Sequence, residues 1–221
     1  MLVKDRMSKP PITVRENVGV EDALRMMHSE DVRRLPVLDK RGSMVGIVSE
    51  LDLLKVSPSP ATSLSVYEIP YLLAKIKMKD VMTKDVISVT EDTPLEEAAR
   101  VMADNKIGGL PVTRNGKVIG MITETDLFKT FLEMLGGREE GVRISMFVPD
   151  EEGMLAKITG RISELGVNIT ALSTIMGQDP SEYLVTIRVE EDADQDALVA
   201  AMKEMGLTLE DARYCKLPAC D

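Results

Sequence analysis

The chain has 221 residues, and 44% of them are hydrophobic, which is enough for two or three small cores. A net charge of −10 and an aromatic content of 3% argue against nucleic acid or an anionic membrane as the main partner. The sequence has no apolar run of about 18 residues and no apolar N-terminal signal segment, so we expect a cytoplasmic protein.

The residue types argue against a metal site and against catalysis. The only cysteines, Cys215 and Cys220, have no Cys/His partners for a zinc site and are expected to be reduced thiols. No Ser/His/Asp set and no P-loop is present, so we expect neither an enzyme nor a cofactor.

The first part of the chain is an internal repeat. Met7-Ser8-Lys9 has a second version in Met82-Thr83-Lys84, and at the same offset Leu35-Pro36-Val37 is matched by Leu110-Pro111-Val112. The chain therefore begins with two copies of a unit of roughly 55 residues.

The first copy is expected at residues 1–56 and reads β-α-β-β-α. Ile12 to Val14 forms a short strand, and the apolar residues that follow from Val20 recur at helical spacing. Leu35 to Leu38 and Met44 to Val48 should pair as a hairpin around Gly42. A closing helix follows.

Residues 57–77 are expected to link the copies. Ser57-Pro58-Ser59-Pro60 breaks regular structure, and a helix is expected beyond it, beginning or kinking near Pro70. The second copy, residues 78–135, repeats the order of the first.

A short stretch near the end of each copy carries the chemistry. Gly46 leads to Ser49 and Asp52, and Gly120 leads to Thr123 and Asp126. A hydroxyl residue three places before a carboxylate is typical of a capping box at a helix start, and such a box needs no ligand. Capping is therefore one interpretation of both stretches.

This doubled pattern resembles the cystathionine-β-synthase (CBS) domain, of which a tandem pair forms a Bateman module. The resemblance implies two clefts that bind adenosine compounds, with the aspartate on the ribose hydroxyls and the hydroxyl residue at ribose or phosphate. One site would use Ile47, Ser49, Asp52, Ala98 and Ile107. The other would use Met121, Thr123, Asp126, Ala23 and Val32.

The two copies differ just before their Leu-Pro-Val segments. Arg33 and Arg34 stand in the first copy where Gly108 and Gly109 stand in the second. The resemblance places these positions near ligand phosphates, to which guanidinium groups can make charge-assisted hydrogen bonds. The alternative is that the arginines are exposed and pair with Asp31 or with the acidic C-terminal part, which carries most of the excess negative charge.

A boundary falls at residues 136–141, and residues 141–217 read β-α-β-β-α-β, a ferredoxin-like order. The stretch Val148-Pro149-Asp150-Glu151-Glu152-Gly153-Met154-Leu155, with Gly166-Val167-Asn168-Ile169 beyond it, resembles the ACT domain. The resemblance implies an amino-acid site at Asp150, Gly153, Met154, Leu155, Asn168 and Ile169. Glu152 stands where the family often has proline, and a purely dimerising role is the alternative.

Together these features predict an α+β protein in which a CBS pair precedes an ACT domain. That order resembles the acetoin-utilisation B-like family. It implies an allosteric regulatory protein, expected as a homodimer, that binds an adenosine ligand such as AMP, ADP or ATP. A structural oligomerisation module without a small-molecule ligand is the alternative.

Overall fold

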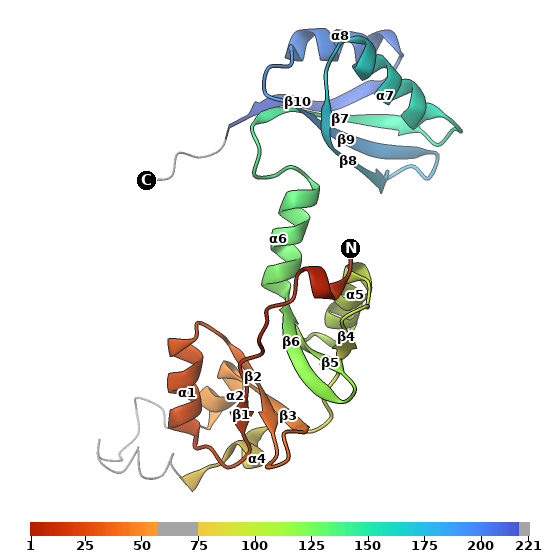
Figure 1. The fold of residues 1–221 in the computed structure, drawn as a ribbon. Helices are drawn as coiled ribbons and strands as arrows, with labels where there is room; N and C mark the ends of the chain where they lie inside the picture. Colours follow the sequence, from red (N-terminus) through yellow and green to blue (C-terminus); the bar gives the residue numbers. More distant parts are fainter. Residues whose placement is uncertain (57–74, 217–221) are drawn as a thin grey trace. The chain divides into compact units, whose positions relative to one another are not determined.

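A computed structural model describes residues 1–56 and 75–216 (Figure 1). Most of the expected linker with its helix, and Cys220, lie outside the described residues. The chain forms two compact units, Met1–Phe128 and Lys129–Asp221. None of the described helices is long and apolar enough to cross a membrane.

The first copy forms a three-stranded sheet. In the sequence, one helix precedes its hairpin and another follows it. Strand β2 pairs in parallel with β1 and antiparallel with β3, which gives the sheet order β1-β2-β3. The elements in chain order are β1 (Val14–Arg15), α1 (Val20–Ser29), β2 (Arg34–Leu38), β3 (Met44–Ser49) and α2 (Glu50–Lys55).

The second copy repeats this arrangement with the sheet order β4-β5-β6. Its elements are β4 (Val89–Thr90), α5 (Leu95–Asn105), β5 (Gly109–Arg114), β6 (Lys117–Thr123) and α6 (Glu124–Met134). The β-α-β-β-α order predicted for both copies is therefore observed.

Each copy's core is completed by a short arm that precedes the other copy's first strand. The turn η1 (Val3–Asp5) packs into the core of the second copy, where Val3 is fully buried. Helix α4 (Met78–Val81) packs into the core of the first copy, where Met78 is fully buried. The hydrophobic residues of the arms therefore hold the two copies together.

Main-chain hydrogen bonds fix the end of each arm against a strand. The Ser8 N–H donates to Met121 O at 2.9 Å, and the Met121 N–H donates to Ser8 O at 3.1 Å. Ile47 and Thr83 exchange the same two main-chain bonds at 2.9 Å each. These contacts require close backbone approach at Gly120 and Gly46. A Cβ on Gly120 would lie 2.7 Å from Ser8 O, and one on Gly46 would lie 2.9 Å from Thr83 O.

Between Gly141 and Cys215 the C-terminal unit forms a four-stranded antiparallel sheet of order β10-β7-β9-β8 with two helices. Its elements are β7 (Gly141–Pro149), α7 (Met154–Glu164), β8 (Ile169–Met176), β9 (Glu182–Val189), α8 (Gln195–Glu204) and β10 (Thr208–Cys215). The predicted βαββαβ order and the α+β class are confirmed.

Both helices of this unit lie on one face of the sheet (Figure 1). Alternate residues of β7 and β9, such as Ile144 and Ile187, are fully buried there against Ile158 and Ile162 of α7 and Leu198 of α8. This alternation is expected for a sheet covered on one side.

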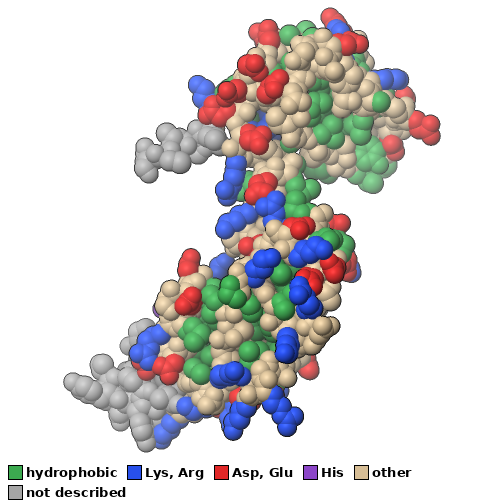
Figure 2. Space-filling model, in the orientation of Figure 1, with side chains coloured by type: hydrophobic (Ala, Val, Ile, Leu, Met, Phe, Trp, Pro, Cys, Tyr) green, Lys and Arg blue, Asp and Glu red, His purple; other side chains and the backbone are tan. Residues whose placement is uncertain are grey.

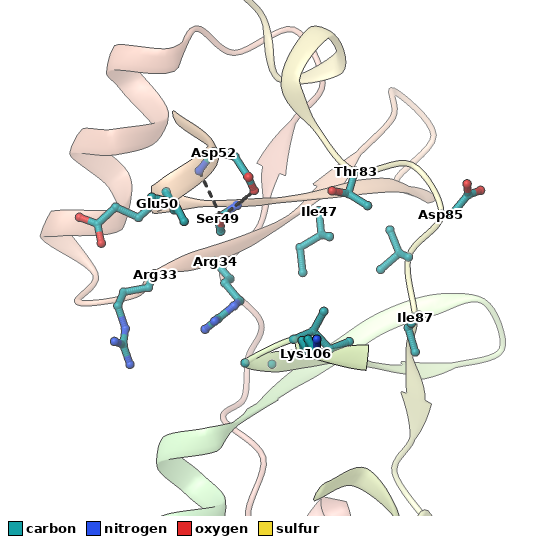
Figure 3. Close-up of a pocket in the computed structure, with 15 residues that line it drawn as sticks. Arg33, Arg34, Ile47, Ser49, Glu50, Asp52, Thr83, Asp85, Ile87 and Lys106 are labelled. Carbon is teal, nitrogen blue, oxygen red and sulfur yellow. Dashed lines mark hydrogen bonds between the residues drawn. The ribbon is translucent and has the colours of Figure 1, made fainter. Parts of the chain in front are cut away.

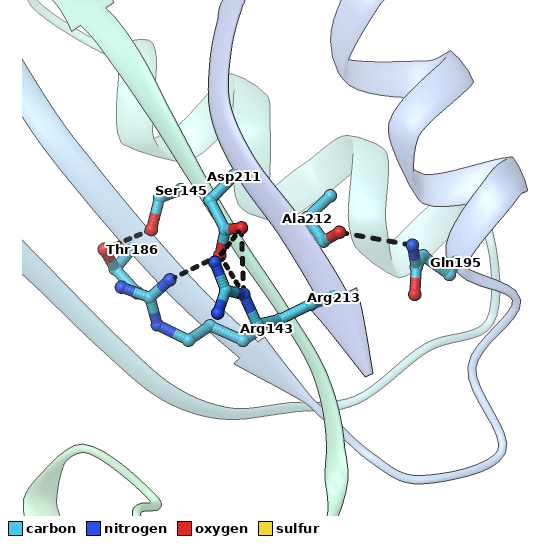
Figure 4. A network of polar contacts seen from close by, with 7 residues as sticks. All are labelled: Arg143, Ser145, Thr186, Gln195, Asp211, Ala212 and Arg213. Atoms are coloured by element: carbon cyan, nitrogen blue, oxygen red, sulfur yellow. Dashed lines mark hydrogen bonds and ion pairs between the residues drawn. The ribbon is translucent and has the colours of Figure 1, made fainter. Parts of the chain in front are cut away.

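The opposite face of the sheet carries a polar network (Figure 4). Arg143 Nη1 donates to Asp211 Oδ2 at 2.9 Å, and Arg213 Nε donates to the same oxygen at 2.8 Å. The buried Ser145 hydroxyl lies 2.8 Å from that of Thr186. These bonds join β10 to β7 and β7 to β9 without apolar packing.

Charge is distributed differently on the two units. On the face drawn in Figure 2, Lys and Arg side chains are prominent over the first unit, while Asp and Glu side chains dominate over the C-terminal unit. The composition of the sequence predicted this difference.

The glycine contacts predict the cost of adding one methyl group. Gly120→Ala should lower the free energy of unfolding by about 1–3 kcal/mol, because its Cβ would collide with the main-chain oxygen of Ser8 and the side chain of Met7 in the arm. Urea unfolding of the full chain measures this loss. Gly160→Ala, in α7 with open space around it, should instead gain about 0.5–1 kcal/mol. Equal effects of the two substitutions would contradict the importance of the arm contact.

The polar network predicts a pH dependence. Hydrogen bonds and charge from Arg213, with the charge of Arg143, lower the pKa of Asp211 below its ordinary value. Its stabilisation is therefore present above the ordinary carboxyl pKa of about 3.9 and is lost as the pH falls through the lowered pKa. Asp211→Asn should destabilise the C-terminal unit near neutral pH, and the difference from wild type should close in strong acid. Urea unfolding at both pH values tests this, and a difference that is independent of pH would refute it.

Candidate functional site

A cavity of about 580 Å³ lies in the first unit and is lined by both copies (Figure 3). The first copy provides the end of β3, the start of α2, the first residue of β2 and the residue before it. The second copy provides the segment after α4 and the residues that join α5 to β5. The lining residues are Arg33, Arg34, Ile47, Ser49, Glu50, Leu51, Asp52, Thr83, Asp85, Val86, Ile87, Lys106, Ile107, Gly108 and Gly109.

The start of α2 is a capping box that faces this cavity. The Ser49 hydroxyl accepts the Asp52 N–H at 3.3 Å, and Asp52 Oδ2 receives the Ser49 N–H at 3.0 Å and the Ser49 hydroxyl at 2.6 Å. The capping interpretation of the stretch is therefore confirmed. The capping hydrogen bonds use only Oδ2 of the Asp52 carboxylate.

Asp52 is half-buried, and its Oδ1 accepts no hydrogen bond from any described residue. A carboxylate can accept from two donors at once, so capping through Oδ2 leaves Oδ1 available to a ligand in the cavity. Capping and ligand binding are thus compatible in this geometry.

Three cationic side chains line the same cavity. Arg33 and Lys106 are exposed, whereas Arg34 is half-buried. Burial lowers the pKa of the Arg34 guanidinium, and the neighbouring Arg33 lowers it further, while the carboxylates of Glu124 and Asp52 act in the opposite direction. No hydrogen bond or ion pair joins Arg34 to another described residue, including Asp31.

Six of the seven residues proposed for the first site line this one cavity. They are Arg33, Arg34, Ile47, Ser49, Asp52 and Ile107. Ala98 does not line it. It is fully buried in the core of the second copy, on the face of α5 that also carries Leu95 and Met102.

Of the residues proposed for the second site, only Thr123 and Asp126 repeat the geometry of the first, and none of the five lines the cavities described for this chain. Thr123 N–H and its hydroxyl donate to Asp126 Oδ2 at 2.9 and 2.7 Å, which repeats the capping geometry of the first copy. Met121 is buried at its bridge to Ser8, and Ala23 is fully buried in the core of the first copy. Val32 is half-buried and packs against that core.

Sequence reasoning missed the wall formed by Thr83, Asp85, Val86 and Ile87, and also Lys106. The sequence shows Thr83 as part of the repeat but not as part of a site. Thr83 is held against the first copy by main-chain hydrogen bonds to Ile47, and such bonds do not depend on the residue type. Lys106 has left-handed backbone geometry at the end of α5, with φ of 54°.

The C-terminal unit has a second cavity of about 370 Å³ at the β7–α7 loop. Of the six residues proposed there, Asp150, Gly153, Met154 and Leu155 line it. Asn168 and Ile169 lie outside it, and the Asn168 N–H donates to Glu190 Oε1 at 3.0 Å. Asp150 and Glu151 line the cavity without a Lys or Arg, which disfavours a ligand carboxylate at this point.

The sequence matches the model of the CBS domain at residues 3–59 and 78–133, together more than half of the chain. The chain belongs to the CBS-domain family. Residues 144–210 match the AHAS small subunit-like ACT domain. The resemblance to tandem CBS domains followed by an ACT domain is therefore confirmed.

A curated relative supports the same assignment. A CBS domain-containing protein of Dictyostelium discoideum is 31% identical over 136 residues, which cover 61% of this chain and 94% of that protein. The crystal structure of AcuB from Vibrio cholerae, described as an acetoin utilization protein, is 31% identical and covers 60% of this chain and 90% of its own, with a TM-score of 0.49.

One solved CBS pair contains ligands. The pair of protein MJ0100 is in complex with 5′-methylthioadenosine and S-adenosyl-L-methionine. It is 30% identical to this chain, covers 63% of it and 98% of its own length, and has a TM-score of 0.50. A CBS pair of this kind thus binds adenosine compounds in that relative.

Proposed function

We propose that the CBS pair is a regulatory module, without catalytic activity, that binds an adenosine-containing ligand in the 580 Å³ cavity. The observation that carries the proposal is the half-buried Asp52 carboxylate, which lines the cavity with one oxygen already fixed by the capping box. The adenosine ligands of the related MJ0100 pair support the choice of ligand class. The cavity volume falls in the range of about 300–1,000 Å³ that is usual for small-molecule sites.

The lining assigns a role to each part of such a ligand. Asp52 Oδ1 would accept a hydrogen bond from a ribose hydroxyl. The aliphatic side chains of Ile47, Val86 and Ile107 would pack on the base. Arg33 and Lys106 carry the positive charge that phosphate groups require.

The C-terminal cavity supports a second candidate, an amino-acid site in the ACT domain. Val148, Met154 and Val185 offer apolar contacts, and Asp150 and Glu151 offer carboxylates to a ligand's ammonium group. In this arrangement the ammonium, rather than the carboxylate, would be the group recognised by side chains. The full protein would then respond to two metabolites, and the expected homodimer is the assembly in which we propose that it acts.

Substitution of Asp52 tests the ribose assignment. Asp52→Ala should weaken adenosine binding by about 2 kcal/mol, roughly thirtyfold, because a charged hydrogen bond to the ribose is lost. Asp52→Glu should also weaken it, because the added methylene displaces the carboxylate although glutamate still serves a capping box. Isothermal titration calorimetry with adenosine and AMP provides the affinities.

Asp80→Ala is the matched control for lost capping. Asp80 Oδ2 accepts the Lys77 N–H at 3.0 Å at the start of α4, outside the cavity lining. The Asp80→Ala variant should have a free energy of unfolding lower by a similar amount, about 0.5–2 kcal/mol, and should keep its affinity for adenosine. Unchanged affinity in both Asp52 variants would refute ribose binding and leave an oligomerisation module as the better description.

The amino-acid candidate predicts a thermal response. An amino acid present at one hundred times its Kd should stabilise the ACT domain by about 2.7 kcal/mol, visible as a higher Tm in a panel of the standard amino acids. The double substitution Asp150→Asn/Glu151→Gln should reduce this shift. Glu152→Gln, next to the cavity but outside its lining, should preserve it. A panel without any shift would exclude this site.

A further inference from the structure

Three arginines stand in one row across the face of the C-terminal sheet that is opposite its helices, which we call the open face. In the strand register, Arg143 of β7 is the direct partner of Arg213 on β10 and of Arg188 on β9. Directly opposed residues of paired strands project from the same face, and like charges in such positions destabilise a sheet. The row therefore needs compensating negative charge.

Asp211 provides only part of this compensation. Its carboxylate accepts a hydrogen bond from Arg143 at 2.9 Å and three from Arg213 at 2.6 to 2.9 Å. Figure 4 shows both guanidinium groups turned toward that carboxylate. Among the described residues Arg188 has no ion pair, so the row sets three positive charges against one negative charge and leaves two positive charges unbalanced.

Arg188 has the most unused donors of the three arginines. Its Nη1 donates to the main-chain oxygen of Glu139 at 2.6 Å, which is its only hydrogen bond to a described residue. Its Nε is buried and has no hydrogen-bond partner in the described structure. Buried donors without a partner are rare in folded proteins, and an oxyanion is a strong acceptor for such a donor.

The segment that precedes β7 holds Arg188 in place. A Cβ on Gly136 would lie 2.8 Å from Arg188 Cδ, so the aliphatic part of the side chain passes directly over this glycine. The bond from Nη1 to Glu139 then fixes one side of the guanidinium. A side chain that is already held in position loses little freedom when it binds a ligand.

The composition of the unit makes the row a specific feature. Residues 136–221 contain 8 Lys and Arg against 17 Asp and Glu, and three of those eight basic residues stand in this row. In so acidic a stretch, carboxylate partners for arginine are plentiful. A row of three arginines that shares a single carboxylate is therefore not explained by the average charge of its surroundings.

We propose that the row of Arg213, Arg143 and Arg188 is an anion-binding site, and that its ligand is a phosphate group, either free or carried by a small metabolite. Guanidinium groups bind phosphate through paired, charge-assisted N–H bonds. A phosphate ester carries a charge of about −1.5 to −2 near neutral pH, which matches the two unbalanced positive charges, whereas a carboxylate matches only one. The proposal is independent of the two cavities discussed above, whose linings contain none of these arginines.

Inorganic phosphate provides the first test, added to the full-length protein in a low-salt buffer. Phosphate should raise the Tm of the wild type, and sodium chloride should reduce this rise because it screens the charges. Arg188→Gln should weaken phosphate binding at least about tenfold, because a charged hydrogen bond is lost. Asp211→Asn should strengthen binding about fivefold, because one negative charge is removed from the site.

Arg161→Gln is the matched control. Arg161 belongs to the same unit but lies on α7, where it pairs with Glu164 and Glu204. Its substitution removes the same charge from the unit and should leave the phosphate affinity within about twofold of wild type. Acetate, a carboxylate with one negative charge, should bind at least about tenfold more weakly than phosphate. An equal loss of affinity in Arg161→Gln, or equal binding of acetate and phosphate, would overturn the proposal.

Nuclear magnetic resonance locates the bound anion. The Nε–H signal of Arg188, identified by its loss in Arg188→Gln, should move as phosphate is added, because this donor has no protein partner among the described residues. A Tm response that leaves the signal unmoved would overturn the proposal. So would a response that disappears in Arg33→Gln and persists in Arg188→Gln, because the anion would then occupy the cavity of the first unit.

Ribose 5-phosphate distinguishes the two sources of the phosphate group. Tighter binding of this ester than of inorganic phosphate, with the same movement of the Arg188 signal, would identify a phosphorylated metabolite as the ligand. Equal or weaker binding with that movement would identify free phosphate. If neither compound moves the Arg188 signal, the row is not a phosphate site.

Discussion

The pairing of each arm with a strand of the other copy is the contact on which the CBS pair depends. Four main-chain hydrogen bonds, at Ser8–Met121 and Ile47–Thr83, bring each arm close to a glycine of β6 or β3. Because neither Gly46 nor Gly120 carries a side chain, the arm can lie directly on the strand, and the apolar residues Val3 and Met78 then reach the opposite cores. Backbone contact and hydrophobic burial act together here.

The same crossing creates the cavity. After its bridge at Thr83, the second arm continues through Val86 and Ile87, which form a wall opposite Ile47 and Asp52 of the first copy. A single copy contains the capping box but only part of the lining. The site is therefore a property of the pair of copies.

Much of this architecture could be predicted from the sequence, because periodicity and capping are local. The order of the elements and the box at Ser49 and Asp52 follow from residue spacing. The crossing of the arms could not be predicted, since its hydrogen bonds use main-chain atoms of any residue type. Ala23 and Ala98 were assigned to cavity walls by resemblance, yet both lie on the apolar faces of their helices, where helical spacing would have placed them in the cores.

The exchanged arms also determine whether one copy could exist without the other. A gene segment that encoded one copy with its own preceding arm would specify a core lacking Val3 or Met78, and an arm whose binding strand is absent. Recombination that cuts between the copies thus yields two incomplete pieces, whereas a cut after the pair leaves both cores whole. Although the sequence reads as two separable units, both hydrophobic cores are therefore complete only when the two copies occur together.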